Sequence, residues 1–289
     1  MGEIVLGSEA VATGHITRAR LRWRYRALYP DVYVPRDDVP TLRDRSVGAW
    51  LWSGRRAVIT GRAAAALHGA KWVDEQAPIE MLWPNNRAPE GIVTRRERIA
   101  DDEMCDIDGM SVATPARVAL DLARHQSRVS AVTHLDALVA ATRLRKVDAV
   151  ALAERYAGAK RVAQCREAFE LMDGGAQSPK ESWLRLLLVD SGFPRPQTQI
   201  PVHHADGYPF AYLDMGWPKV KIAVEYDGDQ HRTDRAQYAW DVRRLRALIE
   251  LGWIHVRVIN EDSARDVVDR VRRAWAQRER EAMVVKRPA

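Results

Sequence analysis

The sequence predicts a mainly helical N-terminal region followed by an α/β C-terminal domain in which helices flank a mixed sheet. Its 289 residues are enough for two domains, at roughly 100 to 200 residues for each. Hydrophobic residues make up 46% and charged residues 29%, a mixture typical of a globular protein and not of a disordered one. Apolar residues recur mostly at helical spacing before the polar segment 173–178, whereas helices and strands alternate after it.

Several classes of protein are excluded by the composition. The longest apolar runs, such as residues 63–67 and 186–189, fall far short of the roughly 18 residues that cross a bilayer. Residues 4–6 are too short for the core of a signal peptide. Cys105 and Cys165 lie far apart, so they suggest neither a disulfide framework nor a zinc cluster. We therefore expect a cytoplasmic protein that does not enter a membrane, with two plain thiols.

Residues 1–40 are predicted to form a shortened winged-helix-like module. A short helix is expected around residues 16–28, an extended segment at 31–35 and a charged turn at 36–38. A basic run without an intervening acid occupies every second position here: Arg18, Arg20, Arg22, Arg24 and Arg26. The formal net charge of +6 and the guanidinium's fit to phosphate favour DNA contact by this run. A solvated helix face is the alternative interpretation.

Residues 41–172 are predicted to form a mainly helical domain. Thr114-Pro115 has the pattern of an N-cap followed by proline at the first helical position. The turn signal Pro84-Asn-Asn separates two expected strands, at residues 79–83 and 91–95. The expected helices cover residues 42–52, 61–69, 115–123, 132–142, 147–156 and 162–171.

Residues 173–289 form the predicted α/β domain. Ser178-Pro-Lys-Glu181 combines a capping residue, a proline and an acid, and so marks a helix start; Gly192-Phe-Pro194 ends that helix. The remaining elements are expected in the order strand, strand, strand, helix, strand, helix, at residues 198–203, 210–215, 219–226, 237–251, 253–259 and 264–278.

Carboxylates gather on the predicted hairpin of this domain. Side chains alternate along a strand, so Glu225 and Asp227 share one face. Pairing across the hairpin brings Asp214, 11 residues before Glu225, close to them. Such acids repel one another and usually bind a hard cation, Mg²⁺ or Mn²⁺. The pattern therefore predicts a metal site, although Asp227-Gly-Asp229 is equally typical of a solvated turn.

His231 follows Glu225 by six residues, across Gly228. An imidazole at this place could activate water or protonate a leaving group. Arg244 stands three residues after Asp241 on a predicted helix, where a surface ion pair is an equally good interpretation.

The C-terminal domain resembles a domain related to the very-short-patch-repair endonucleases, within the PD-(D/E)XK nuclease superfamily. The resemblance covers about residues 173–275 and rests on Leu213-Asp-Met-Gly-Trp217, Val224-Glu-Tyr-Asp-Gly-Asp-Gln-His231, and Asp241, Arg244, Leu248, Gly252, Trp253 and Arg257. It implies a restriction-endonuclease-like fold in which Asp214 and Glu225 bind the metal, with Asp227 as an added ligand. It also implies an acid on the first helix at Glu181, an acid or base at His231, and phosphate contacts by Arg244 and Arg257.

One position departs from the superfamily pattern. Asp227 stands where a lysine usually follows the glutamate by two positions. Lys221 is four residues from Glu225, which at about 3.3 Å per residue is too far to replace it. A catalytically silent domain is therefore left open.

The N-terminal half resembles the antitoxins of type IV abortive-infection systems, which are winged-helix repressors with an added helical domain. The resemblance rests on residues 26–34, Gly61-Arg-Ala-Ala-Ala-Ala-Leu-His-Gly69, Gly109 and Thr114-Pro-Ala-Arg-Val-Ala-Leu-Asp-Leu122.

These observations predict a metal-dependent DNA endonuclease that acts in repair or defence. The N-terminal arginines would dock on DNA, and the C-terminal domain would hydrolyse a phosphodiester bond with Mg²⁺ or Mn²⁺. The alternative is a non-enzymatic DNA-binding regulator or antitoxin that keeps the nuclease-like fold as a scaffold. DNA is the expected partner, and a homodimer is left open.

Overall fold

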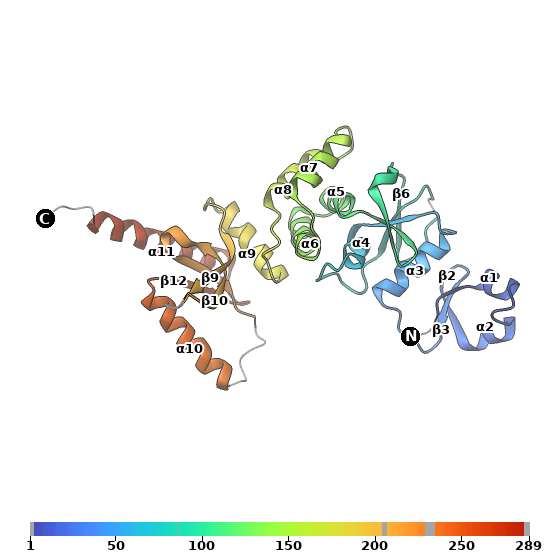
Figure 1. Ribbon diagram of the computed structural model, residues 1–289, viewed down its shortest axis with the longest axis horizontal. Helices are drawn as coiled ribbons and strands as arrows, with labels where there is room; N and C mark the ends of the chain where they lie inside the picture. The colour runs from blue at the N-terminus through green and yellow to red at the C-terminus, as the bar shows by residue number, and fades with distance from the viewer. Residues whose placement is uncertain (1–2, 86, 204–206, 229–234, 286–289) are drawn as a thin grey trace. The chain divides into compact units, whose positions relative to one another are not determined.

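In the computed structural model, the described residues are 3–85, 87–203, 207–228 and 235–285. The chain divides into two compact units, unit 1 from Met1 to Gly174 and unit 2 from Gly175 to Ala289 (Figure 1). This division lies within the polar segment 173–178. No helix in these ranges combines the length and the apolar character that a membrane span requires.

Unit 1 begins with a small module of helices and strands. Its elements are β1 (Val5–Leu6), α1 (Gly7–Ala12), α2 (Arg18–Arg24), β2 (Tyr25–Tyr29) and β3 (Val32–Pro35), and the strands pair antiparallel in the order β1-β3-β2. Helix α2 is shorter than expected, because Tyr25 already pairs with Pro35 in the hairpin. The run of arginines therefore continues from a helix into a strand.

A five-stranded mixed sheet follows in the order β6-β5-β4-β8-β7. The elements are α3 (Leu42–Trp52), β4 (Val58–Thr60), α4 (Gly61–Leu67), β5 (Ile79–Leu82), β6 (Ile92–Arg95), η1 (Asp101–Glu103), β7 (Met104–Ile107) and β8 (Met110–Ala113). The expectation of a mainly helical region over 41–172 missed β4, β7 and β8. These strands have three or four residues, and β4 is buried throughout, so it lacks the alternation that marks a strand.

Four helices complete unit 1: α5 (Pro115–His125), α6 (Arg128–Ala141), α7 (Lys146–Arg155) and α8 (Val162–Leu171). Helix α5 packs against α4, α6, α7 and α8. Every residue from Arg117 to Arg124 is buried, charged side chains included. Helix α5 is therefore the central element of this part of the unit, and its charges need partners inside the protein.

Unit 2 has a four-stranded mixed sheet in the order β12-β11-β10-β9, in which β11 and β12 run parallel and the other neighbours antiparallel. The elements are α9 (Pro179–Asp190), β9 (Gln197–His203), β10 (Pro209–Trp217), η2 (Pro218–Val220), β11 (Ile222–Tyr226), α10 (Arg235–Glu250), β12 (Ile254–Val258) and α11 (Ala264–Val285). Ser178 caps α9 as expected, with its hydroxyl accepting from the Glu181 N–H. The mixed sheet with helices confirms the α/β class of this domain.

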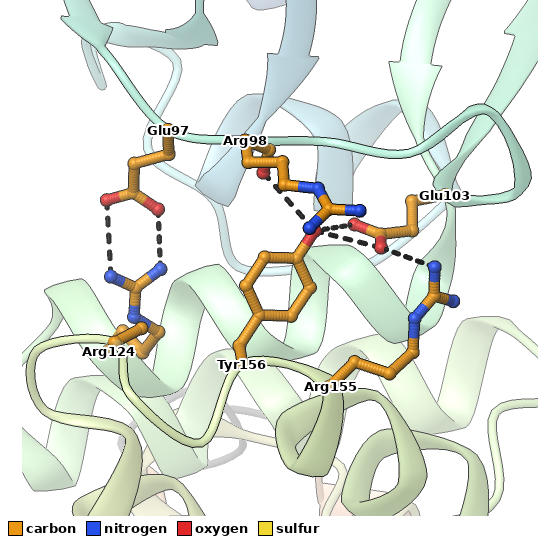
Figure 2. Close-up of a pocket in the computed structure, with 7 residues that line it drawn as sticks. Glu97, Arg98, Glu103, Arg124, Arg155 and Tyr156 are labelled. Carbon is orange, nitrogen blue, oxygen red and sulfur yellow. Dashed lines mark hydrogen bonds and ion pairs between the residues drawn. The ribbon is translucent and has the colours of Figure 1, made fainter.

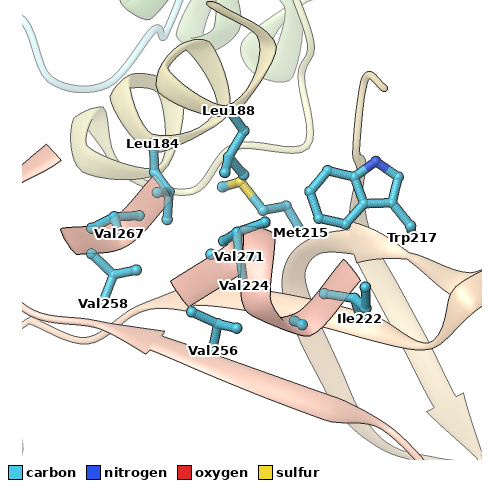
Figure 3. Packing of buried hydrophobic residues seen from close by; sticks show 11 residues of the cluster. Leu184, Leu188, Met215, Trp217, Ile222, Val224, Val256, Val258, Val267 and Val271 are labelled. Carbon is cyan, nitrogen blue, oxygen red and sulfur yellow. The ribbon is translucent and has the colours of Figure 1, made fainter. Parts of the chain in front are cut away.

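Helices α9 and α11 pack on the sheet through a continuous apolar core (Figure 3). Among its buried members are Leu184, Leu188, Met215, Val224, Val256 and Val271. A second cluster joins Leu248 of α10 to Leu213 and Ala223 of the sheet. Few residues of α10 take part, so most of that helix is available to line a cleft.

Gly216 is required where β10 and β11 approach each other. A Cβ atom at this position would collide with the Ile222 carbonyl oxygen. Backbone atoms cannot yield as a flexible side chain does, so the hairpin would have to open.

We expect Gly216→Ala to lower the free energy of unfolding by about 1 to 3 kcal/mol, the usual cost of forcing extra atoms into a packed site. Urea unfolding followed by circular dichroism measures the loss. Gly158→Ala is the matched control, because a Cβ atom there meets nothing within 4 Å. Equal stability of the two variants would contradict the steric explanation.

Candidate functional site

A cleft of about 1060 Å³ lies in unit 2 between α10 and the strands β10, β11 and β12. It contains three of the predicted carboxylates together with three basic side chains: Asp214, Glu225, Asp227, Arg244, His255 and Arg257. Aromatic and aliphatic side chains of α10, β10, β11 and the residue after β12 form most of the rest of its wall. The cleft is therefore the place where the sequence-predicted site residues meet.

Glu225 is buried and held by two basic groups. Arg244 donates from Nη1 to Oε2 at 3.0 Å and from its second terminal nitrogen to Oε1, while the His255 ring bonds to Oε2. Burial by itself would raise the pKa of Glu225, but the hydrogen bonds from His255 and Arg244 outweigh it and lower the pKa to about 2. Glu225 is thus a permanently ionised anchor.

Asp214 has less compensation than its neighbour. Its Oδ2 accepts a hydrogen bond from the Tyr226 N–H at 2.9 Å. Burial and the charges of Glu181 and Glu225 raise its pKa to about 7, against the opposing effects of that hydrogen bond and of Arg244. Near neutral pH the Asp214 carboxyl is therefore partly protonated, because its burial and the neighbouring acids outweigh the positive charge of Arg244.

Glu181 belongs to the start of α9. Its Oε2 accepts from the Gln177 N–H at 2.8 Å, and its own N–H donates to the Ser178 hydroxyl at 3.1 Å. Burial first, and then the charge of Glu225, raise its pKa. Glu181 thus belongs to the first turn of α9, which Ser178 caps, and its charge also acts on Asp214.

Asp227 forms an ion pair with Arg257 of the neighbouring strand β12. Its backbone N–H donates to the Val258 carbonyl at 2.7 Å, which extends the parallel pairing of β11 and β12. Asp227, the predicted extra metal ligand, and Arg257, the predicted phosphate contact, are therefore paired with each other. Arg244 is likewise engaged, by Glu225 and by the Tyr212 carbonyl.

The three predicted metal ligands do not have carboxylate oxygens that all lie within 4.8 Å of one another. Among the described residues, the group whose three ligand atoms lie within 4.8 Å of one another is Glu97, Asp121 and His125 of unit 1, and not Asp214, Glu225 and Asp227. A divalent cation at Asp214 would therefore draw its second carboxylate, Glu225, away from Arg244. The predicted acid or base His231 lies outside the described residues.

His255 is a site residue that the sequence analysis missed. It pairs with Ala223 in the parallel register of β11 and β12, and its ring reaches Glu225 two positions further along β11. It also stands two residues before Arg257, which places both side chains on one face of β12. That spacing was visible in the sequence, but the pairing partner of β12 was not.

The predicted DNA-contacting arginines of α2 are exposed. Arg18, Arg20, Arg22 and Arg24 have no ion-pair partner in the part of the chain that the structure describes. Thr17 caps the start of α2 through the Arg20 N–H at 3.2 Å. Arg36 closes its end by donating to the carbonyls of Arg22 and Tyr25, each at 3.1 Å. The two caps hold a short basic helix in place.

A second cavity, of about 510 Å³, lies in unit 1 beside a network of paired charges (Figure 2). Arg124 donates to Glu97, while Glu103 accepts from the Tyr156 hydroxyl and pairs with Arg155. Hydrogen bonds from His125 and Arg124 outweigh the burial of Glu97 and lower its pKa to about 2.

Arg117, fully buried on α5, completes this network. It donates to Glu103 at 2.7 Å and to Asp121 at 3.1 Å. The two arginines Arg117 and Arg124 satisfy the acids that surround them, so they would repel a cation at Glu97, Asp121 and His125. We therefore assign the network to stability and not to metal binding.

We expect the stability of unit 2 to fall as pH rises, because the folded-state pKa of Asp214 lies above its ordinary value. The contribution of Asp214 is fully present well below its ordinary pKa of 3.8, where folded and unfolded states are both protonated, and it is lost as pH rises through about 7. Asp214→Asn should remove the loss and gain up to roughly 4 kcal/mol over wild type at pH 8. Urea unfolding across this pH range measures the difference, and parallel curves for the two proteins would contradict the assignment.

One comparison with known proteins is confined to unit 1, and another extends over most of the chain. Residues 57–173 match the family of the AbiEi antitoxin C-terminal domain, a stretch that includes the five-stranded sheet, helices α5 to α8 and the Arg117 network. Two uncharacterized proteins of Mycobacterium tuberculosis, from strains CDC 1551 and H37Rv, are each 28% identical over 227 residues, covering 78% of this chain and 83% of theirs. No solved structure gives a significant match. The family match ends at residue 173 and does not reach the cleft of unit 2. The similarity to an antitoxin domain therefore concerns residues 57–173 of unit 1.

Proposed function

We propose that this protein is a DNA-binding regulator of the antitoxin type. The observation that carries the proposal is the basic helix α2, with four exposed arginines, placed ahead of a region similar to the AbiEi antitoxin C-terminal domain. The order of two helices and a hairpin in residues 5–35 agrees with the winged-helix module that the antitoxin resemblance implies. A module of this kind binds an operator through its second helix.

The geometry of α2 suits contact with a phosphate backbone. At 3.6 residues per turn, Arg18 and Arg22 form one column on the helix and Arg20 and Arg24 form a second. Trp23, which is 75% exposed, lies between the two columns. Arginines without acidic partners need not break an ion pair before they bind a phosphate.

We expect the affinity of the full chain for duplex DNA to fall steeply with salt, because each phosphate contact releases counterions. Replacing Arg20, Arg22 and Arg24 together with alanine should reduce the slope of log affinity against log salt by about 2 to 3. Fluorescence anisotropy with a labelled duplex measures it. The matched control replaces three exposed arginines of α11, Arg265, Arg272 and Arg273. An unchanged slope for the α2 variant would show that DNA binds elsewhere.

A second function, metal-dependent hydrolysis of DNA, is favoured by one specific observation. Asp214 is a half-buried carboxyl with a pKa of about 7 in a cleft that also holds Glu225, so a bound cation would relieve the repulsion between them. Asp214 and Glu225 would hold Mg²⁺ or Mn²⁺, and Glu181 would supply further negative charge. When bound, such an ion polarises a phosphate and lowers the pKa of water.

The chain's own residues would then have separate tasks. Arg244, once released from Glu225, is close enough to bind a phosphate oxygen, and Arg257 could exchange Asp227 for a second phosphate. His255 beside Glu225, or His231, could accept the proton of the attacking water. Asp227, in the place of the usual lysine, adds no positive charge, so any hydrolysis should be slow.

If the cleft holds a hard cation, millimolar Mg²⁺ or Mn²⁺ should raise the melting temperature, since a ligand that binds the folded state stabilises it. Asp214→Asn should abolish the shift, and Asp269→Asn on α11 should keep it. Cleavage should require the metal and disappear in Glu225→Gln. If metal leaves the melting curve unchanged and duplex, single-stranded, mismatched and branched DNA all stay intact, hydrolysis is excluded and the regulator remains.

A further inference from the structure

The cleft of unit 2 has an apolar wall that neither metal binding nor regulation explains. Tyr212 is 56% exposed, Trp240 44%, Leu245 39% and Ile249 59%, and all four line the cleft. Single exposed apolar side chains are ordinary, but four that face one concave site are typical of a ligand pocket.

Arg244 connects this wall to the acids. Its Nη2 donates to the Tyr212 carbonyl at 3.1 Å, its guanidinium lies 5.7 Å from the centre of the Trp240 ring, and its Nη1 reaches Glu225 at 3.0 Å. One side chain thus contacts an aromatic residue of α10, the strand that carries Tyr212, and the central carboxylate. The aromatic and acidic parts of the cleft are therefore within the span of one small ligand.

The apolar wall and the charged side chains of the cleft together indicate which kind of ligand it binds. An apolar peptide would cover the wall but would also desolvate Glu225, Arg244 and Asp214, which is costly without new polar contacts. Paired duplex DNA would present its sugar-phosphate backbone and leave the aromatic rings unused. A nucleotide with an unpaired base offers a flat apolar face to the rings and a phosphate to the arginine.

We propose that the cleft of unit 2 binds a single-stranded or unpaired nucleotide of DNA, with its base stacked against Tyr212 and Trp240 and its phosphate beside Arg244. The inference deepens the proposed function and rests on binding of DNA by this chain. It assigns the cleft a preference for unpaired strands, while the arginines of α2 contact the backbone of either form.

The test uses the full chain and a short single-stranded oligonucleotide that carries the fluorescent base 2-aminopurine. Stacking on an aromatic ring quenches this base, whereas anisotropy of an end label reports binding anywhere on the protein. We expect wild type to quench the fluorescence of the base. The Kd obtained from this quenching should rise about 10-fold in Tyr212→Ala and in Trp240→Ala. Both side chains are exposed, so the variants should fold, and Trp240→Phe should keep the quenching because it keeps a ring.

The two readouts separate the possible failures. An anisotropy change without quenching, or quenching that survives both alanine variants, would overturn the stacking inference and leave DNA binding in place. Absence of any anisotropy change with single-stranded and duplex DNA would overturn the proposed function and the inference together.

Discussion

A buried charge is stable only beside a partner, and this constraint organises both units of the protein. In unit 1, the fully buried Arg117 on α5 bonds to Asp121 of the same helix, to Glu103 of η1, to Tyr156 just after α7 and to the Arg98 carbonyl in the loop that follows β6. In unit 2, Glu225 on the central strand β11 is held by Arg244 from α10 and His255 from β12. In each unit a single ionised side chain joins elements that are distant in sequence.

The degree of compensation separates a structural network from a candidate site. In the Arg117 network, hydrogen bonds from His125 and Arg124 lower the pKa of Glu97, whereas burial raises the pKa of Asp121 despite its pairing with Arg117. Asp214 keeps a raised pKa because its burial, together with the charges of Glu181 and Glu225, outweighs the Tyr226 hydrogen bond and Arg244. A raised pKa in an open cleft is a mark of a candidate binding site, whereas buried acids that are each paired with a buried arginine are a mark of structural support.

Under both functions considered for the protein, the arginines of α2 and the cleft of unit 2 have separate roles. The exposed arginines of α2 would supply affinity for the phosphate backbone, which is independent of sequence. The cleft of unit 2 would then recognise the state of the strand, whether or not it also hydrolyses a bond. A regulator and a slow nuclease therefore differ in whether Asp214 and Glu225 hold a cation, and not in how the chain meets DNA.

Local patterns in the sequence were sufficient for the elements with strong start signals. Ser178-Pro-Lys-Glu181 placed the start of α9, and Thr114-Pro115 that of α5, because caps are local interactions. The strand β4 was missed because it is short, buried and paired with strands distant in sequence. The strands β7 and β8 form a local hairpin, but each has only four residues and therefore carries little periodic signal.

The need for contacts between distant segments also limited what the sequence could predict about the site. The alternation of side chains and the hairpin spacing determined, from sequence alone, that Asp214 and Glu225 belong to one acidic cluster. Only the tertiary structure decided that Arg244 and His255 neutralise Glu225 and that Asp227 pairs with Arg257. These partners come from α10 and β12, and ion pairs between distant segments depend on how the elements pack, which no local pattern contains.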